Sequence, residues 1–246
     1  MDRCSVCGSG RLAVDTRGPL DPHLAVPASI DCDVVLFDMD GTLVDSTPLV
    51  ERIWGRWAAK HGVDLPRLLQ ISHGRPTIET LSIIAPHLAT AEEAARLDAE
   101  ESDEPDGLSP VRGAPELIAS LPADRWGVVT SAGRRLAVSR LTAAGLPVPR
   151  VLVTSDDVDR GKPDPASYLE AARQFAVPAD RTVVFEDTSV GIAAGRAAGA
   201  TVIGVTTTFP TLEGCDYSIQ DLRAIRRVTG NGPIRLVVES LDQSSG

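Results

Sequence analysis

Short runs of apolar, β-branched residues alternate with helical patterns along most of this 246-residue chain. Such runs predict buried strands when turn residues bound them. Helical patterns fill the intervals, for example at residues 134–144 and, after Pro165, at residues 166–175. Alternation of helices with wholly apolar strands predicts an α/β fold: a Rossmann-like parallel sheet core covered by helices on both faces. The predicted strands are residues 34–37, 127–130, 151–154, 182–185 and 201–205.

One long segment, residues 47–112, breaks the alternation because its pattern is helical throughout. Its first helix carries an apolar stripe, for which we expect ordinary packing rather than ligand contact: Val50, Ile53, Trp54, Trp57 and Ala58. A helical insertion directly after the first strand predicts a small cap over the carboxyl edge of the sheet. The predicted division is an N-terminal extension that is poorly ordered (1–32), a Rossmann-like core (33–46 and 112–246) and a helical cap domain (47–111).

The composition is that of a soluble globular protein, with 43% hydrophobic and 24% charged residues. A formal net charge of −10 disfavours binding to nucleic acid or to an anionic membrane. No apolar run approaches the roughly 20 residues that span a bilayer, and residues 1–30 lack the apolar centre of a signal peptide. We therefore expect no nucleic-acid or membrane partner, a cytoplasmic location, and a monomer or weak homodimer.

The N-terminal segment holds half of a zinc-ribbon pattern, Cys4-x-x-Cys7. His23 and Cys32 could complete it only with unusual spacing. Residues 9–29 mix Gly, Pro and Asp without periodicity, which is typical of a poorly ordered tail. We favour the tail over a zinc site.

Chemically active side chains follow four of the predicted strands. Ligands of parallel sheets gather beyond the carboxyl ends of the strands, so these side chains are expected to meet there. Taken singly, each has a structural explanation as a turn residue, a helix cap or a solvated charge. Together they indicate one site. In chain order they are Asp38 and Asp40, Thr130 and Ser131, Lys162, and Glu186 and Asp187.

This set of groups suits phosphoryl transfer. Carboxylates of Asp38 and Asp187, with Glu186 near, offer the hard oxygens that Mg²⁺ prefers, and the metal offsets repulsion between an anionic nucleophile and a phosphate. Lys162, one of only two lysines in the chain, adds a second positive charge. Ser131 and neighbouring N–H groups could hold phosphate oxygens. An aspartate can attack phosphorus while a second acid protonates the leaving alkoxide and activates water.

Four segments, in order "DMDGT", "VVTSA", "GKPDP" and "FEDTSVG", resemble the motifs of the haloacid dehalogenase superfamily. The resemblance covers residues 34–208 and is strongest to its sugar and polyol phosphatases, including glycerol-phosphate and deoxyglucose-phosphate phosphatases. It implies Asp38 as nucleophile and Asp40 as general acid/base. It also implies Mg²⁺ held by Asp38, the backbone carbonyl of Asp40 and Asp187, and phosphate bound by Lys162 and a strand-end hydroxyl. Ser131 matches that hydroxyl best, with Thr130 as the alternative.

The resemblance predicts a Mg²⁺-dependent phosphatase for a small sugar or polyol phosphate, with two alternatives. A phosphosugar mutase of the beta-phosphoglucomutase type carries a cap histidine, but the matching position here is Val50. A catalytically silent binding protein of the same fold would have no need for the Asp38–Asp40 pair. Within the cap, "SHGRPTIET" forms the turn expected to face the site, so His73 and Arg75 are candidate specificity residues, unless the turn merely points at solvent.

Overall fold

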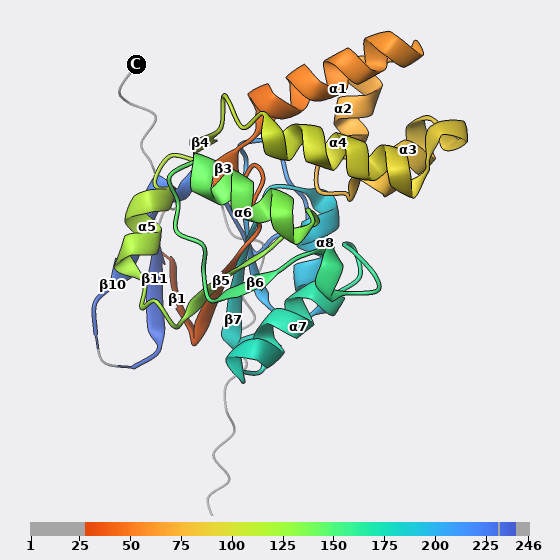
Figure 1. Ribbon diagram of the computed structural model, residues 1–246. Coiled ribbons are helices and arrows are strands. Elements are labelled where there is room, and N and C mark those ends of the chain that lie inside the picture. The colour runs from red at the N-terminus through yellow and green to blue at the C-terminus, as the bar shows by residue number, and fades with distance from the viewer. Residues whose placement is uncertain (1–27, 231, 240–246) are drawn as a thin grey trace, which may run out of the picture.

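The centre of the protein is a six-stranded parallel sheet (Figure 1). The computed structural model describes residues 28–230 and 232–239. Strand order across the sheet is β6-β5-β2-β7-β8-β9, with every neighbouring pair parallel. This confirms the predicted α/β fold, and a sixth strand, β9, lies at one edge. The strands are β2 (Val34–Phe37), β5 (Trp126–Val129), β6 (Val151–Val153), β7 (Thr182–Glu186), β8 (Thr201–Val205) and β9 (Tyr217–Ile219).

Helices cover both faces of this sheet, which is why its central strands are apolar throughout. Side chains alternate along β2: Val35 and Phe37 belong to the core beneath α5 (Ala114–Ser120) and α6 (Arg134–Ala143). Val34 and Leu36 belong to the opposite core, beneath α7 (Ala166–Phe175) and α8 (Ser189–Ala197). All four β2 side chains are buried, so the strand is fixed from both sides.

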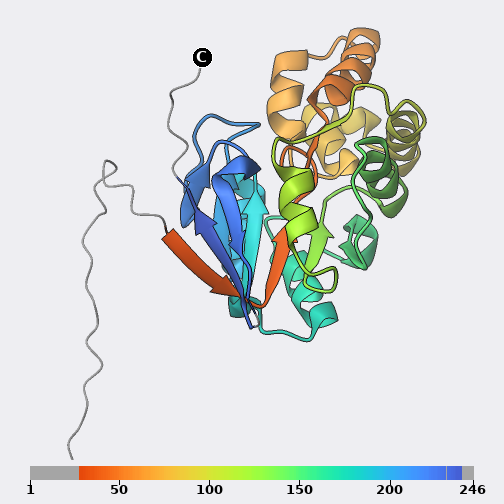
Figure 2. The ribbon, with the colours of Figure 1, turned by 90° about the vertical axis from the view of Figure 1, so that its left-hand side faces the viewer.

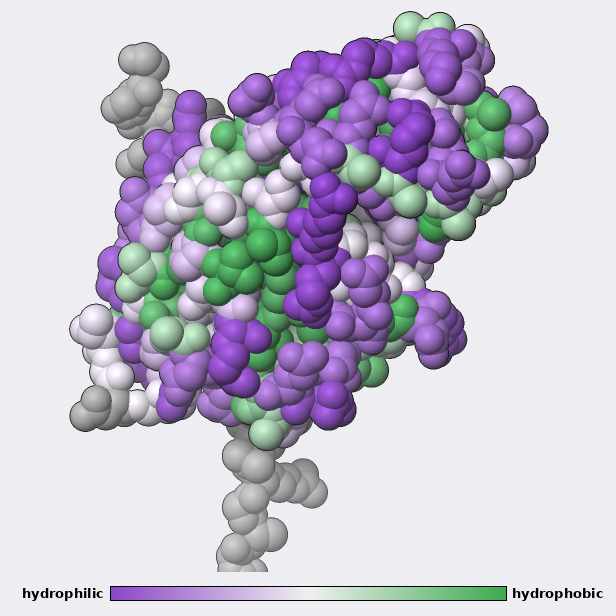
Figure 3. Space-filling model, viewed as in Figure 1, coloured by the Kyte–Doolittle hydropathy of each residue, from purple (hydrophilic) through white to green (hydrophobic). Residues whose placement is uncertain are grey.

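Four helices form the predicted insertion, and they lie beyond the carboxyl ends of the strands (Figure 1). The apolar stripe of α1 packs with residues of the other three helices into a separate core, as expected, although Val50 and Trp54 also border the cavity next to the sheet edge. Hydrophilic side chains cover most of the outer surface of the insertion in Figure 3. The helices are α1 (Thr47–His61), α2 (Leu65–Ser72), α3 (Thr77–Ile84) and α4 (Ala91–Asp103), and the short strands β3 (Val44–Asp45) and β4 (Ser109–Pro110) pair where the chain leaves and re-enters the core.

A second, three-stranded antiparallel sheet corrects the prediction for the N-terminal extension. Its order is β1-β11-β10, and β1 (Ala28–Cys32) lies beside β11 (Ile234–Val238) in Figure 2. The third strand is β10 (Ile225–Val228). The expectation of poor order through residue 32 is therefore wrong for residues 28–32, because this strand pairs with β11 and buries Ile30 and Cys32 in the core.

Residues 1–27, with Cys4, Cys7 and His23, lie outside the described residues. Cys32, which could have completed a zinc pattern with them, is buried among apolar side chains. None of the helices in residues 28–230 and 232–239 is long and apolar enough to cross a membrane.

Candidate active site

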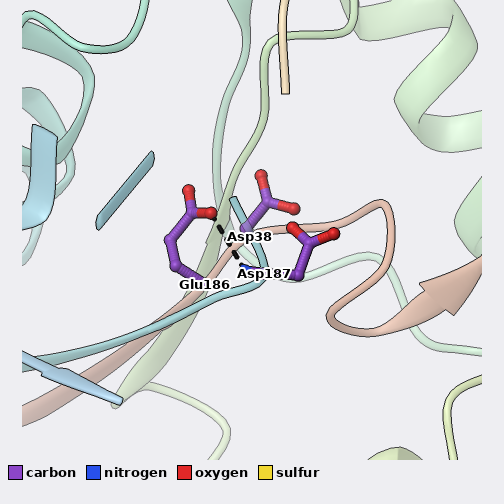
Figure 4. A group of neighbouring side chains, drawn as sticks. All are labelled: Asp38, Glu186 and Asp187. Carbon is purple, nitrogen blue, oxygen red and sulfur yellow. Dashed lines mark hydrogen bonds between the residues drawn. The ribbon is translucent and has the colours of Figure 1, made fainter. Parts of the chain in front are cut away.

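Three of the predicted acids converge at the ends of two neighbouring strands. Asp38 follows β2, Glu186 ends β7 and Asp187 follows it, and β2 pairs with β7 in register from Val34 to Phe37. Each side chain offers one carboxylate oxygen, and these oxygens lie within 4.8 Å of one another. Figure 4 shows the carboxylates of Asp38 and Asp187 side by side. All three residues are buried, so the sheet brings together the acids that the sequence predicted to meet.

Lys162 inserts its ammonium group between two of these acids. Its Nζ donates to Oδ1 of Asp38 at 2.5 Å, to Oε1 of Glu186 at 2.6 Å and to the carbonyl of Val129 at 3.1 Å. All three ammonium hydrogens therefore have an acceptor. Burial opposes the charge, but Asp38 and Glu186 raise the pKa of Lys162 above its ordinary value. The lysine is held as a fixed positive charge behind Asp38.

Both carboxylate oxygens of Glu186 accept hydrogen bonds from neighbouring groups. Its Oε1 accepts from Lys162 and from the buried hydroxyl of Tyr168, at 2.7 Å from the latter. Its Oε2 accepts from the backbone N–H of Asp187 at 3.1 Å and from the hydroxyl of Thr188 at 3.2 Å. Both oxygens are thus occupied. Glu186 fixes Lys162 and the first turn after β7.

Asp38 and Asp187 carry more negative charge than their surroundings compensate. Burial raises the pKa of Asp38 to about 8; Lys162 acts against this shift, and Glu186 adds to it. Burial, Asp38 and Glu186 together raise the pKa of Asp187 well above its ordinary value. Oδ1 of Asp187 is buried and has no hydrogen-bond partner in the described part of the chain. A divalent cation between Asp38 and Asp187 would satisfy this oxygen and hold both groups ionised, so the donors fit Mg²⁺.

The turn after β2 places Asp40 close to Asp38 and leaves no room for a side chain at Gly41. Backbone N–H groups of Leu43 and Val44 both donate to the carbonyl of Met39, which closes the turn. Gly41 has φ +78, and a Cβ there would lie 2.0 Å from Oδ2 of Asp187. Only glycine combines this conformation with so close an approach. The "DMDGT" segment is therefore packed directly against the predicted metal ligand.

Asp40 is held by an arginine that the sequence analysis did not single out. Nη1 of Arg140, on α6, lies 2.6 Å from Oδ2 of Asp40. Oδ1 of Asp40 is buried and without a partner among residues 28–230 and 232–239. The other end of the Arg140 guanidinium pairs with Glu101 of α4. A sequence signal existed for both residues, because each occupies an apolar position of its helix: Arg140 follows Leu136 and Ala137, and Glu101 follows Ala94 and Leu97.

The two hydroxyls after β5 have different partners. Oγ1 of the buried Thr130 accepts from the N–H of Ala132 at 3.1 Å, which leaves its own proton for another acceptor. Oγ of Ser131 donates to the carbonyl of Gly74 at 2.9 Å, in the turn between α2 and α3. The Ser131 proton is therefore engaged by the helical insertion.

A cavity of about 370 Å³ lies between the sheet edge and the insertion. Lys162, Glu186 and Asp187 lie close to Asp38 but are not part of its lining. The predicted site residues in its lining are Asp38, Asp40, Thr130, Ser131, His73 and Arg75.

Both candidate specificity residues border this cavity rather than pointing only at solvent. Burial lowers the pKa of His73, while Asp40 and Glu51 act in the opposite direction. The His73 ring contacts Phe209 edge-on, with ring centroids 5.9 Å apart. Nη1 of Arg75 donates to the carbonyl of Ile71 at 2.9 Å, which holds the guanidinium group at the end of α2.

Comparison with known proteins places this geometry in a family. Residues 32–199 match the family model described as haloacid dehalogenase-like hydrolase. The chain is 38% identical to hexitol phosphatase A of Escherichia coli, covering 79% of this chain and 93% of that protein. It is 34% identical to glycerol-1-phosphate phosphohydrolase 2 of Saccharomyces cerevisiae, covering 81% and 86% respectively.

A solved structure shares the fold. A hydrolase from Pseudomonas syringae superposes with a TM-score of 0.67 at 26% identity, covering 78% of this chain and 94% of that one. The resemblance predicted from the four motifs is confirmed by these matches. The chain belongs to the haloacid dehalogenase-like hydrolase family.

Proposed function

We propose that this hydrolase is a Mg²⁺-dependent phosphatase that hydrolyses a small sugar or polyol phosphate through a phosphorylated Asp38. The observation that carries the proposal is the pairing of two acids in different environments at one strand end. Asp38 is buried and paired with Lys162, whereas the partly exposed Asp40 pairs with Arg140 through Oδ2 and has no partner for Oδ1 among the described residues. Both acids line the cavity. Two carboxyl groups held differently at one site suit a nucleophile and a proton carrier.

The first half of the reaction transfers the phosphoryl group to the protein. An oxygen of Asp38 attacks phosphorus, and the bond between phosphorus and the sugar oxygen breaks. The carboxyl group of Asp40 gives its proton to the leaving oxygen, so that a neutral alcohol departs.

The second half returns the protein to its starting state. Asp40, now a carboxylate, takes a proton from a water molecule, whose oxygen attacks phosphorus. The bond between phosphorus and Asp38 breaks, which releases inorganic phosphate and restores both carboxyl groups. The net reaction consumes one water and converts a phosphate monoester into an alcohol and phosphate.

Mg²⁺ bound by Asp38, Asp187 and the backbone carbonyl of Asp40 would neutralise negative charge on the phosphate. Support comes from the unpartnered Oδ1 of Asp187 and from the raised pKa values of Asp38 and Asp187. Glu186 fits less well as a direct ligand, because Lys162, Tyr168 and Thr188 already occupy its oxygens. We propose that it supports the site from behind.

Phosphate oxygens would be bound by a hydroxyl after β5 and attracted by the positive charge of Lys162, whose ammonium hydrogens donate to Asp38, Glu186 and the carbonyl of Val129 in this structure. The hydrogen bonds favour Thr130 over Ser131, because the Thr130 hydroxyl donates to none of the described residues while the Ser131 proton is donated to Gly74. Ser131 would instead join the phosphate-binding loop to the insertion.

The substrate proposal rests on the cavity and on the names of the relatives. A cavity of about 370 Å³ that carries His73, Arg75 and several carboxylates suits a small, hydroxyl-rich molecule. Hexitol phosphatase A and glycerol-1-phosphate phosphohydrolase 2 are named for substrates of this class. Val50 also lines the cavity, so the position matched to the mutase histidine is apolar, which favours the phosphatase over the mutase. A cytoplasmic location and a monomer or weak homodimer remain our predictions.

The test is a panel of substrates assayed with the purified protein. Metal is first removed from the protein, and each substrate is then assayed with and without added Mg²⁺. Sorbitol 6-phosphate, glycerol 1-phosphate and p-nitrophenyl phosphate are compared by phosphate release. We expect hydrolysis of at least one sugar or polyol phosphate, dependent on Mg²⁺. The matched control is Asp45→Asn, a third acid of the same segment, which accepts a hydrogen bond from the N–H of Thr47 and should stay active. Activity without added metal, or no hydrolysis of any sugar or polyol phosphate, would contradict the proposal.

A further inference from the structure

A chain of three charged groups, of which Arg140 and Glu101 are buried, connects Asp40 to the helical insertion. Arg140 is 6% exposed and Glu101 4% exposed. One end of the Arg140 guanidinium lies 2.6 Å from Oδ2 of Asp40, and the other end pairs with Oε2 of Glu101. All three residues line the cavity. The chain thus runs from the sheet, through α6, to α4.

Packing alone does not account for these charges. Taking a guanidinium and a carboxylate out of water costs several kcal/mol per ion, and apolar residues of similar size often stabilise a fold equally well. Arg140 and Glu101 each occupy a position at which their helix otherwise presents Ala or Leu to the interior. Burial of these charges therefore lowers the stability of the fold relative to apolar residues, which points to a role at the cavity.

The contact with Asp40 is one-sided. Arg140 engages only Oδ2, and no described residue donates to the buried Oδ1. Binding of one oxygen restrains the rotation of the carboxyl group and leaves the other oxygen for proton exchange. Nε of Arg140 is also buried and has no partner among the residues that the structure describes, so the guanidinium is held through its two terminal nitrogens, by Asp40 and by Glu101.

We propose that Arg140 is a positioning residue that orients the Asp40 carboxyl group for proton transfer, and that Glu101 anchors Arg140 to α4. The inference rests on the proposed function, in which Asp40 carries the proton. It adds that the proton carrier, although it belongs to the core, is oriented in part from the helical insertion. Arg140 acts through Asp40 and is not itself the proton donor.

Two variants test the chain of contacts. Arg140→Lys keeps the positive charge, but a single ammonium group lacks the fork that spans two carboxylates. Glu101→Gln keeps the size of the anchor, removes its charge and leaves Asp40 untouched, so it serves if Arg140→Lys folds poorly. The matched control is Arg135→Lys: Arg135 joins the same two helices through Asp103 at 2.6 Å, but on the surface and away from Asp40.

The readout is kcat/KM for sorbitol 6-phosphate in two backgrounds, the wild-type protein and Asp40→Asn, the latter at raised enzyme concentration. In the wild-type background Arg140→Lys should lower kcat/KM about tenfold to hundredfold, part of what a proton carrier supplies. In the Asp40→Asn background it should lower kcat/KM less than about twofold, because residues that act through one another are not additive. Glu101→Gln should show the same pattern with a smaller loss, and Arg135→Lys no loss in either background.

The opposite pattern overturns the inference. Equal losses in both backgrounds would mean that Arg140 supports the fold or binds substrate directly, and an equal loss in Arg135→Lys would assign the effect to the junction of α4 and α6. Full activity of both Arg140→Lys and Glu101→Gln would also overturn it. These results leave the proposed function intact. A wild-type protein that hydrolyses no phosphate monoester would instead overturn the proposed function, and this role with it.

Discussion

The ammonium nitrogen of Lys162 lies 2.5 Å from Oδ1 of Asp38, with both side chains buried. This pair matters for stability and for chemistry, because the charge that offsets part of the negative charge at Asp38 would also attract the phosphate. Burial of Asp38 without Lys162 would leave an uncompensated carboxylate beside Glu186.

Lys162→Met should therefore destabilise the fold as well as abolish activity. Removing one partner of a buried ion pair costs about 3–5 kcal/mol, which urea unfolding of the metal-free protein would measure. The only other lysine provides the control: Lys60→Met, in the last turn of α1, should change neither quantity. A Lys162→Met protein as stable as the wild type would contradict the assigned contacts.

Asp40→Asn should separate metal binding from proton transfer. We expect Mg²⁺ affinity by calorimetry to stay close to that of the wild type, since the expected metal contact there is a backbone carbonyl. Turnover should fall by a factor of about 10²–10⁴, the usual contribution of a general acid/base. Loss of Mg²⁺ binding, with unchanged turnover at saturating metal, would show that the side chain is a ligand instead.

His73→Ala and Arg75→Ala should alter substrate preference. Each should raise KM for the best sugar phosphate. The rise should correspond to a loss of about 1–3 kcal/mol of binding free energy for each lost hydrogen bond to a charged group. Hydrolysis of p-nitrophenyl phosphate should change much less, since this reporter makes few contacts with the insertion. Arg67→Ala is the control, an exposed arginine of α2 outside the cavity lining. Equal losses on both substrates would place His73 and Arg75 in the catalytic machinery or the fold.

The ionised Glu93 side chain should stabilise the insertion, and this stabilisation should be lost at acidic pH. Hydrogen bonds from Arg96, together with one from Trp57 and against the effect of burial, lower the pKa of Glu93 to about 2. A carboxyl group with a lowered pKa in the fold stabilises the folded state at pH values above its ordinary pKa of 4.5. This contribution is lost as the pH falls from about 4.5 to about 2. Glu93→Gln should therefore lose less unfolding free energy over this range than the wild type, in denaturant titrations at each pH. Glu92→Gln, one residue away and exposed, should follow the wild type; identical curves for Glu93→Gln and wild type would refute the assignment.

The central sheet and its acids could be predicted because both are recognisable in short stretches of sequence. Each β-branched run produced a strand within one residue of its predicted ends, and a buried strand followed by Asp38 or by Asp187 delivers that acid to the sheet edge. Helix α7 has the predicted bounds, set by Pro165 at its start.

The second sheet could not be predicted, because its strands are defined by partners far away in the chain. Residues 28–32 become β1 only by pairing with residues 234–238, and the polar residues Arg226 and Arg227 of β10 give no buried run. The Asp40–Arg140–Glu101 chain is similar. A charge on an apolar helix face could have been noticed, but the identity of its partner depends on how α4 and α6 meet.

The central claim, a covalent phosphoryl group on Asp38, is tested most directly by acid quenching during turnover. With p-nitrophenyl phosphate, whose leaving group needs no proton from Asp40, Asp40→Asn should accumulate the adduct, because the water that removes it is no longer activated. Radiolabelled substrate, quenching and peptide mapping should place the label on the peptide that contains Asp38, and borohydride reduction should convert Asp38 to homoserine. Asp38→Asn should take up no label and lose turnover by several orders of magnitude. Label elsewhere, label retained in Asp38→Asn, or near wild-type turnover of Asp38→Asn would contradict the account.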